Sequence, residues 1–403
     1  MLQISAKKNI KTTIALPSSK SESNRVLLLN ALYEKQSNKK LDLHNISTAR
    51  DTVTMQRLLA SKDLEMNVLD AGTTMRFLTA FCSITRRKAI LTGTDRMCER
   101  PIRVLVEALQ NLGAEINYLQ KDGFPPLEIQ DFAQKTKHIQ IRGDVSSQYI
   151  SALLMLAPLL PQGLTLELLG TVHSKPYILM TLELMQHFGI ESIWQENTIH
   201  IATQNYQFAS YTVEADWSAA SYWYSVLALA EDGEIFLEKV KEKSLQGDKA
   251  IVAIARYFGV ESHFTDSGVQ LSKSKTKEIP NNTIDFSHCP DLAQTIAVLA
   301  AAQGREIYMT GLQSLRIKET DRILAIQNEL ANFGIVSTVE KDTDLWIKSQ
   351  KIQAPTQAVE TYKDHRMAMA FAPLALLFPI CIEEPEVVAK SYPHFWEDIQ
   401  KIC

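Results

Sequence analysis

The chain has 403 residues, of which 45% are hydrophobic and 22% charged, a composition that predicts a folded protein of about two domains. Its formal net charge of −4 argues against a protein that binds nucleic acid over a broad basic surface. The N-terminus has no signal-peptide core, the most apolar stretch (368–382) is too short and too interrupted by proline to span a membrane, and the cysteines and histidines show neither disulfide nor metal-ligand spacing, so we expect a cytoplasmic protein without a metal or cofactor.

Six apolar helices are predicted along the chain, each opening with polar residues. They begin near residues 19, 70, 146, 216, 290 and 364, with the sequences SKSESNRVLLLNAL, DAGTTMRFLTAF, SSQYISALLMLAPLL, DWSAASYWYSVLALA, PDLAQTIAVLAA and DHRMAMAFAPLALL. Because these helices are apolar nearly all round, we expect them in the interior of the protein, covered by strands.

Four further segments alternate with these helices and share one pattern: apolar residues at helical spacing, a glycine, and a short alternating run. Their glycines are 76, 70 and 75 residues apart, at Gly113, Gly189, Gly259 and Gly334. Each segment predicts a helix that ends at a left-handed glycine and is followed by a strand. The regular spacing predicts about six α/β units in two domains of three, with a boundary near residues 213–218.

The openings of the six apolar helices are candidate anion sites. A helix N-terminus offers free N–H groups and a partial positive charge. For any single helix, ordinary N-capping by Ser, Asp or Thr explains these residues as well. Capping does not require the accompanying cations Lys20, Arg25, Arg76 and Arg366, so the set as a whole favours anion binding.

The first two groups of candidate residues are cationic. In LPSSKSESNRVLLL (16–29), Lys20 lies at a loop-to-helix junction, and Ser21 and Arg25 share one helix face. An ammonium, a hydroxyl and a guanidinium in this arrangement suit an oxyanion. In DAGTTMRFL (70–78), Gly72 permits close approach of the backbone to a ligand, and in the segment that follows, Arg100 precedes a proline in a rigid stretch.

The third group consists of hydroxyl and amide side chains at two helix starts. Ser146, Ser147 and Gln148 are consecutive, and Ser174 and Tyr177 belong to the segment SKPYI. These residues suit the recognition of a phosphate or hydroxyl group, although many helices open with serines.

The fourth group places carboxylates beside cations. In LRIKETDRI (315–323), Lys318 and Arg322 are four residues apart and Glu319 lies between them. A solvent-exposed ion-pair helix is the simpler interpretation of this segment alone. The presence of Asp291, Asp364-His365-Arg366 and Lys390 in the same half of the chain favours a site with titrating groups.

These segments, in this order from residue 16 to beyond residue 390, resemble the motif series of the 5-enolpyruvylshikimate-3-phosphate (EPSP) synthase family. The resemblance implies an α/β fold: a two-domain inside-out α/β barrel with three βαβαββ units per domain, closing around substrate in a cationic cleft. It implies that residues 1–18 and 216–403 form one domain and residues 19–215 the other. It also implies transfer of the enolpyruvyl group of phosphoenolpyruvate to the 5-hydroxyl of shikimate 3-phosphate, with release of phosphate.

The resemblance further implies roles for individual residues. Asp291 is expected to be the base at the attacking hydroxyl, Glu319 the proton donor to the methylene carbon, and Lys20 a third catalytic group. Contacts to shikimate 3-phosphate are expected from Lys20, Ser21, Arg25, Ser146, Ser147, Gln148, Ser174, Tyr177, Asp291, Ser314 and Lys318. Contacts to phosphoenolpyruvate are expected from Lys20, Gly72, Arg100, Gln148, Arg322, Arg366 and Lys390. The two substrates together bring roughly six negative charges, which seven of these side chains can balance.

Three positions depart from the pattern of the family. Asp70 stands where Asn often precedes Ala-Gly-Thr, Phe77 follows Arg76 where many members have Pro, and Ser314 occupies a position often held by Asn. A carboxylate at position 70 would weaken anion binding unless another group neutralises it.

Two alternative functions remain open at the level of sequence. An enolpyruvyl transferase for a UDP-amino sugar shares the repeats, but its usual reactive Cys, five residues before an Arg-Pro, is replaced here by Asp95. A non-catalytic phosphometabolite-binding or RNA-binding repeat protein would not need the pair Asp291 and Glu319. We expect a monomer that binds two small substrates and neither nucleic acid nor membrane.

Overall fold

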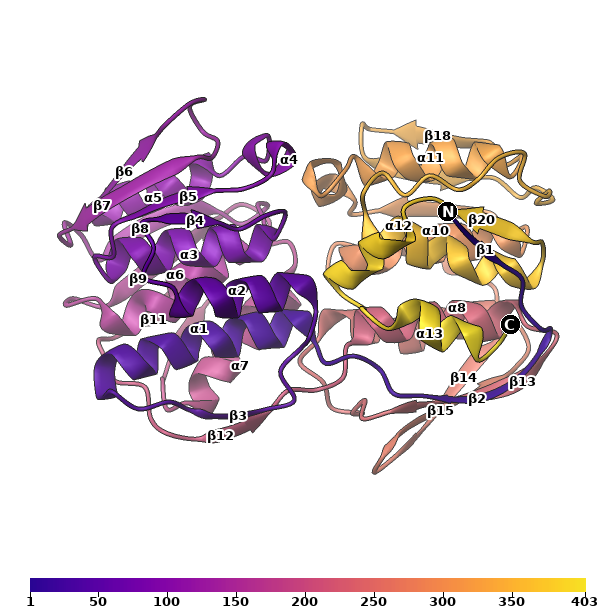
Figure 1. Cartoon of the computed structure of the whole chain (residues 1–403), viewed down its shortest axis with the longest axis horizontal. Helices are drawn as coiled ribbons and strands as arrows, with labels where there is room; N and C mark the ends of the chain where they lie inside the picture. Colours follow the sequence, from indigo (N-terminus) through magenta and orange to yellow (C-terminus); the bar gives the residue numbers. More distant parts are fainter. The chain divides into compact units, whose positions relative to one another are not determined.

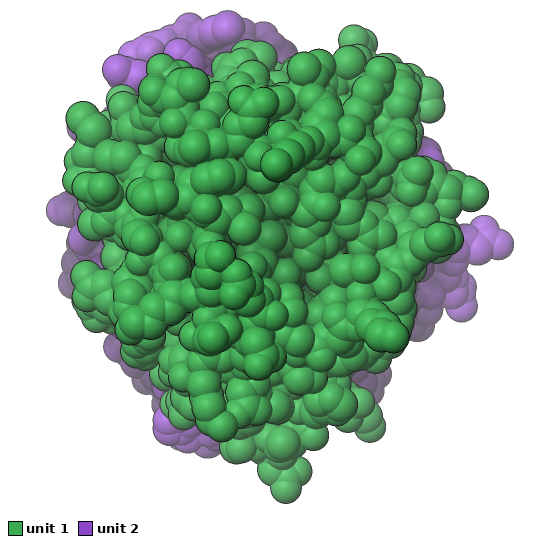
Figure 2. Space-filling model, turned by 90° about the vertical axis from the view of Figure 1, so that its right-hand side faces the viewer, with its two compact units in different colours: residues 1–19, 214–403 green, residues 20–213 purple.

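The computed structural model describes all residues, 1–403, and the chain divides into two compact units. Unit 1 comprises Met1–Ser19 and Glu214–Cys403, and unit 2 comprises Lys20–Val213. Figure 2 shows that residues from both ends of the chain make up a single body in unit 1. The boundaries implied by the family resemblance, after residues 18 and 215, lie one and two residues from those of the structure. None of the helices combines the length and apolar character needed to cross a bilayer.

Four groups of elements share the order strand, helix, strand, helix, strand, strand. Unit 2 contains two of them. The first is β4 (Glu65–Asn67), α3 (Gly72–Ile84), β5 (Ala89–Thr92), α5 (Arg103–Leu112), β6 (Ala114–Tyr118) and β7 (Leu127–Phe132), with the short α4 (Asp95–Cys98) before α5. The second is β8 (His138–Arg142), α6 (Ser147–Leu156), β9 (Leu164–Leu169), α7 (Lys175–His187), β10 (Ile193–Gln195) and β11 (Thr198–Ile201).

Unit 1 contains the other two groups. The first is β2 (Asn9–Ile14), α8 (Trp217–Leu229), β13 (Asp232–Glu238), α9 (Ile251–Ile254) with η3 (Ala255–Phe258), β14 (Val260–Thr265) and β15 (Gly268–Lys273). The second is β16 (Thr283–Asp285), α10 (Ala293–Ala302), β17 (Ile307–Thr310), α11 (Arg322–Asn332), β18 (Ser337–Glu340) and β19 (Asp344–Ile347). Strand β2 pairs in parallel with β13 although more than 200 residues separate them, so the N-terminal strand belongs to unit 1.

All four sheets have the same strand order. The first two strands of each group are parallel neighbours, and the hairpin of the last two strands joins the second strand, giving β4-β5-β7-β6, β8-β9-β11-β10, β2-β13-β15-β14 and β16-β17-β19-β18. This recurrence confirms the α/β repeats expected from the sequence. A third group in each unit supplies only a two-stranded sheet, β3 (Asp42–His44) with β12 (Ser210–Thr212) in unit 2 and β1 (Leu2–Ile4) with β20 (Ile380–Ile382) in unit 1.

The six predicted apolar helices are present and form the core of each unit. They are α1 (Lys20–Ser37), α3, α6, α8, α10 and α12 (His365–Phe371). Every residue of α12 is buried, and so is every residue of α10 up to Ala301. Within unit 1 the helices α8, α10 and α12 pack against one another, with α10 and α12 side by side above α8 in Figure 1. Burying a large apolar side chain contributes about 1.5–3 kcal/mol, so helices apolar on all sides are stable only beneath sheets.

The four predicted glycines end helices in the left-handed conformation. Their φ angles are 119° at Gly113, 84° at Gly189, 82° at Gly259 and 76° at Gly334. At Gly113 a Cβ atom would lie 1.8 Å from the carbonyl oxygen of Ala133, so close packing excludes a side chain as well. The predicted helix, glycine and strand pattern is confirmed at all four positions.

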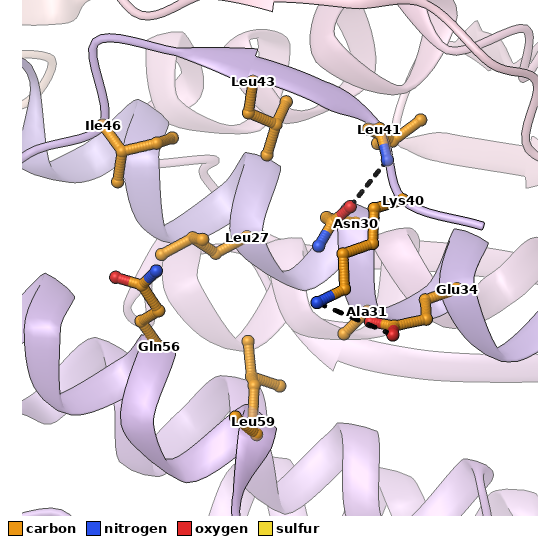
Figure 3. A pocket seen from close by; sticks show the side chains of 11 residues that line it. Leu27, Asn30, Ala31, Glu34, Lys40, Leu41, Leu43, Ile46, Gln56 and Leu59 are labelled. Carbon is orange, nitrogen blue, oxygen red and sulfur yellow. Dashed lines mark hydrogen bonds and ion pairs between the residues drawn. The ribbon is translucent and has the colours of Figure 1, made fainter. Parts of the chain in front are cut away.

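A groove lies where the third group of unit 2 has only two strands. It has a volume of about 310 Å³. Its walls are formed by α1, by α2 (Arg50–Ala60) and by the segment 40–46, which contains β3 (Figure 3). Its walls are Leu27, Asn30, Ala31, Glu34, Lys40, Leu41, Leu43, Ile46, Gln56, Leu59 and Ala60. The segment is held over the groove by Asn30, whose Oδ1 accepts a hydrogen bond of 2.8 Å from the N–H of Leu41. None of the predicted site residues lines this groove.

Candidate active site

Lys20 is the first residue of α1, as the sequence predicted for a loop-to-helix junction. Its Nζ lies 3.2 Å from Oδ2 of Asp51 in the first turn of α2. Both side chains are largely buried, with exposed fractions of 16% and 4%. The ion pair fixes the ammonium group at the start of the helix. Asp51 was not identified from the sequence, because its partner lies 31 residues away.

Arg25 is buried and joins three helices of unit 2. Its Nε donates to Oγ1 of Thr181 (2.7 Å) in α7, and its Nη2 donates to Oγ of Ser151 (3.2 Å) in α6. It also donates to the backbone oxygens of Ser21 (2.9 Å) and Tyr177 (3.3 Å). Burial lowers the pKa of Arg25 to about 10, although nearby Tyr177 opposes this shift. The guanidinium therefore stays charged at neutral pH and brings Ser21 and Tyr177 to one place.

Gly72, Arg76 and Arg100 form a second cationic group in unit 2. A Cβ atom on Gly72 would lie 2.7 Å from Nη1 of Arg76 and 2.8 Å from Nη1 of Arg100, so both guanidinium groups lie against the first residue of α3. Both arginines are 6% exposed. Arg76 donates a 2.9 Å hydrogen bond to Oε1 of Gln148 at the start of α6. The structure thus joins three predicted site residues and adds Arg76, which was not among the expected substrate contacts.

The two departures in this region have structural partners. Asp70 Oδ2 accepts a hydrogen bond of 2.8 Å from Nη2 of Arg50, so its carboxylate is paired with a cation. Phe77 is fully buried in α3, and the guanidinium of Arg25 lies 5.7 Å from the centre of its ring. The aromatic ring gives the buried arginine a cation–π contact.

The predicted hydroxyl residues lie at the starts of two helices. Ser146 caps α6, since its Oγ accepts from the N–H of Gln148 at 3.4 Å. Ser147 is the first residue of α6 and is buried. Ser174 precedes α7 in a left-handed conformation (φ 53°), and its carbonyl oxygen accepts from the N–H of Tyr177. A left-handed non-glycine residue is uncommon and marks a constrained backbone at this helix start.

In unit 1 the central carboxylate is Asp291, in the turn η5 (Pro290–Leu292) before α10. Its Oδ1 accepts from Nη1 of Arg322 at 3.0 Å and lies 3.7 Å from Nζ of Lys318. Its Oδ2 accepts from Nη2 of Arg366 at 2.9 Å. Three predicted cations from two segments, 318–322 and 366, therefore surround the predicted base.

Arg322 begins α11 and contacts three carboxylates. Besides Asp291, it donates to Oε2 of Glu319 (2.9 Å) and to both carboxylate oxygens of Asp364 (2.7 and 3.3 Å). Burial disfavours its charge, but Asp364, Glu319 and Asp291 more than offset this effect and raise the pKa of Arg322. Lys390, also buried, lies 3.6 Å from Oε1 of Glu319. The structure therefore combines the predicted acid, the base and all four cations of unit 1.

Arg366, in the first turn of α12, connects this cluster to α8. Its Nη2 donates to Oγ of Ser218 and its Nη1 to the hydroxyl of Tyr222, both at 3.3 Å. Ser218 also donates to the buried carboxylate of Asp248. Burial and the nearby charge of Asp291 raise the pKa of Asp248 to about 6. The sequence did not identify Ser218, Tyr222 or Asp248, which become neighbours of Arg366 only through folding.

Ser314, the remaining predicted residue of unit 1, lies in the turn η6 (Gln313–Ile317), which ends just before Lys318. Its side chain is half-buried. Both units thus have cations at helix beginnings, Lys20 at α1 in unit 2 and Arg322 at α11 in unit 1, and the guanidinium of Arg322 also binds the carboxylates of Asp291 and Glu319. Such an arrangement can bind oxyanions and move protons.

Comparisons with known proteins identify the family of the chain. A family model described as EPSP synthase (3-phosphoshikimate 1-carboxyvinyltransferase) matches residues 39–399. The chain is 44% identical to a 3-phosphoshikimate 1-carboxyvinyltransferase of Bacteroides fragilis (strain ATCC 25285), covering 99% of this chain and 97% of the relative. It is 35% identical to the enzyme of the same description from Pasteurella multocida (strain Pm70), covering 98% and 96%.

A solved structure of an EPSP synthase from Acinetobacter baumannii has the same fold, with a TM-score of 0.76 at 20% identity, covering 99% of this chain and 97% of that one. The family model and the relatives extend over nearly the whole chain and over both units. The chain belongs to the EPSP synthase family.

Proposed function

We propose that this transferase moves the enolpyruvyl group of phosphoenolpyruvate onto the 5-hydroxyl of shikimate 3-phosphate and releases phosphate. Membership of the EPSP synthase family supports this activity, as do the two groups of buried cations. Both substrates carry a phosphate and a carboxylate, and charge-assisted hydrogen bonds to such groups contribute about 1.5–3 kcal/mol each. The reaction belongs to the shikimate pathway, which leads to chorismate and the aromatic amino acids.

Shikimate 3-phosphate is assigned to the hydroxyl-rich helix starts. Ser146, Ser147 and Ser174 bind its phosphate, and the N-terminal ends of α6 and α7 contribute backbone N–H groups there. Its ring hydroxyls and carboxylate are bound by a second set of residues. These are Ser21, Arg25, Tyr177, Asp291, Ser314 and Lys318.

Phosphoenolpyruvate is assigned to the guanidinium and ammonium groups. Arg100 and Gln148, at Gly72, are its partners in unit 2, where Arg76 is an additional candidate because it contacts both Gly72 and Gln148. In unit 1 its partners are Arg322, Arg366 and Lys390. Lys20 serves both substrates.

The chemistry is an addition followed by an elimination. Asp291 takes the proton of the 5-hydroxyl as its oxygen attacks C2 of phosphoenolpyruvate, while protonated Glu319 gives a proton to C3. The product of this step is a tetrahedral ketal with a methyl group. The bond from C2 to the phosphate oxygen then breaks, phosphate leaves, and loss of a methyl proton restores the enol double bond.

The observation that carries this proposal is the shared partner of the acid and the base. One guanidinium, that of Arg322, binds Asp291 at 3.0 Å and Glu319 at 2.9 Å. Arg322 cannot be deprotonated under ordinary conditions, so it orients both carboxylates without competing for the transferred proton. The two groups are therefore held next to each other, as concerted proton transfer at neighbouring atoms requires.

A phosphate-release assay tests the activity. Phosphoenolpyruvate is supplied with shikimate 3-phosphate, or with UDP-N-acetylglucosamine in a parallel reaction. We expect phosphate only with shikimate 3-phosphate. Release only with the UDP-sugar would favour the alternative transferase, and no release with either acceptor would contradict the proposed function.

A further inference from the structure

Glu214 is a buried carboxylate that the proposed mechanism does not use. Its Oε1 accepts from the indole N–H of Trp217 (3.0 Å) and from the backbone N–H of Lys241 (3.1 Å). Its Oε2 accepts from Oγ of Ser244 (2.7 Å) and from Nε2 of Gln246 (3.2 Å). Burial raises the pKa of the Glu214 carboxyl, and the four donors oppose that shift. Four neutral donors thus satisfy both oxygens of the buried carboxylate.

Glu214 lies where the chain returns from unit 2 to unit 1, so its hydrogen bonds hold the returning segment in place. Glu214 is the first residue of unit 1 after the chain leaves unit 2. Its carbonyl oxygen accepts from the N–H of Ser19 (2.8 Å), and the next residue, Ala215, pairs with Ser18. The side chain of Glu214 thus anchors the returning segment to the loop 241–246, immediately before α8 begins.

The anchor extends to the active-site cluster through Gln246. The Oε1 of Gln246 accepts from the N–H of Trp217 (2.9 Å), the first residue of α8. Nε2 of Gln246, which donates to Glu214, also donates to the carbonyl of Ala215 (2.8 Å). The residue after Trp217 is Ser218, whose hydroxyl accepts from Arg366. The path from Glu214 through Gln246 to Arg366 therefore consists of three hydrogen bonds and one covalent step, from Trp217 to Ser218.

We propose that Glu214 is a positioning residue that holds the start of α8, and with it Ser218, where Arg366 needs it to bind the carboxylate or phosphate of phosphoenolpyruvate. This inference rests on the proposed role of Arg366. The competing explanation is that Glu214 only stabilises the fold. The two differ because a positioning role affects the binding of one substrate, whereas a stabilising role affects the folded fraction alone.

The substitution Glu214→Gln tests the inference with little change of shape. An amide NH₂ replaces one acceptor oxygen, so one pair of donors loses its partner. We expect the KM for phosphoenolpyruvate to rise about tenfold, equivalent to ~1.4 kcal/mol, while kcat and the KM for shikimate 3-phosphate change far less. Glu329→Gln is the matched control, since Glu329 is also 4% exposed and accepts from Tyr362 and the N–H of Glu360. It should lower thermal stability without changing either KM.

A double-mutant cycle with Ser218→Ala identifies the route of the effect. If Glu214 acts through Ser218, the double variant should show about the same KM for phosphoenolpyruvate as Ser218→Ala alone. Gln246→Ala, which removes the intermediate contact, should reproduce the effect and serves if Glu214→Gln does not fold. An unchanged KM in Glu214→Gln and Gln246→Ala, or fully additive effects in the cycle, would overturn the inference. An unchanged KM for phosphoenolpyruvate in Arg366→Ala would instead overturn the assigned role of Arg366.

Discussion

Arg322 shows how one residue organises the carboxylates of unit 1. Its side chain is 2% exposed and contacts Asp291, Glu319 and Asp364. Three carboxylates in one place repel one another, and their mutual repulsion is acceptable only because a cation lies between them. Removing one partner of a buried ion pair is costly, because the remaining charge keeps its desolvation penalty.

Arg322→Met should therefore lower the free energy of unfolding at pH 7 by about 3–5 kcal/mol, measured by urea denaturation. Arg316→Met is the control. Arg316 also contacts a carboxylate, Asp321 at 2.7 Å, but its side chain is 34% exposed. Surface ion pairs contribute about 0–1 kcal/mol, so the control should lose far less. Equal losses in the two variants would show that Arg322 is not the electrostatic centre of the cluster.

Asp248 predicts a pH-dependent contribution to stability. Burial raises its pKa from an ordinary value near 4 to about 6. Since the folded state favours the neutral carboxyl, its stabilising contribution is complete below about pH 4 and is lost as the pH rises through 6. Asp248→Asn cannot ionise. The melting temperature of this variant, relative to the unchanged protein, should therefore rise between pH 5 and pH 7. A constant difference across that range would contradict the raised pKa.

At the scale of residues, the sequence predicted the groups at helix openings better than their partners. Lys20, Asp291 and Arg322 could be selected because cations and carboxylates at such positions are unusual, and the family resemblance supplied their expected roles. Asp51 and Ser218 could not be selected, because a serine or an aspartate in the first turn of a helix looks the same in the sequence whether or not it faces a cation. Their importance comes from contacts with residues far away in the sequence.

At the scale of elements, Gly72 at the start of α3 and Gly113 after α5 are required for different reasons. Substituting each glycine by alanine distinguishes the two reasons. For a Cβ on Gly72, at the start of α3, the three nearest atoms would all be at the ends of the flexible Arg76 and Arg100 side chains. A Cβ on Gly113, after α5, would meet the backbone of Ala133, and its φ of +119° disfavours a side chain.

Gly72→Ala should therefore leave thermal stability nearly unchanged and raise the KM for phosphoenolpyruvate, because the two guanidinium groups are displaced. Gly113→Ala should do the reverse: it should lower the melting temperature and leave the KM of the folded protein unchanged. Steady-state kinetics and thermal denaturation of both variants check this prediction. A large stability loss in Gly72→Ala without a change in KM would mean that Gly72 is a packing residue.

The groove beside the two-stranded sheet of β3 and β12 in unit 2 is a place where the protein can be packed more tightly. Ala31 is one of the residues that line this groove (Figure 3). Ala31→Leu adds apolar volume there and should raise the free energy of unfolding by about 1 kcal/mol, the usual gain from filling a cavity. The control Ala331→Leu places the same side chain on an exposed position of α11 and should have little effect. Denaturant titration that shows no gain for Ala31→Leu would mean that the groove cannot accept a larger side chain.

At the scale of elements, the six interior helices and the four helix, glycine and strand segments could be predicted because each has a strong local pattern. The two-stranded third sheets could not. Strand β12, with the sequence SYT, and strand β3, with DLH, are three residues each, which is too short for a period-2 pattern to be visible. The pairing of β2 with β13 is likewise invisible locally, because the partner strands are far apart in the chain.

For the whole molecule, the fold brings cations from distant parts of the chain together although the net charge is −4. In unit 1, Arg322 and Arg366 come from different segments and both bind Asp291. The α/β class and the repeats were predictable from periodicity and glycine spacing. The assignment of the N-terminal strand to unit 1 came only from the family resemblance, since composition shows no linker.

The most direct test of the account is the rate of phosphate release from phosphoenolpyruvate and shikimate 3-phosphate by Asp291→Asn, at saturating substrate. The amide keeps the shape of the side chain but cannot accept the hydroxyl proton, and a general base contributes about 10²–10⁴-fold. Asp285→Asn, an exchange of the same type at an exposed aspartate of β16, is the control. We predict a rate at least about 100-fold lower for Asp291→Asn and a nearly unchanged rate for the control. A rate for Asp291→Asn close to that of the unsubstituted protein would contradict the proposed mechanism.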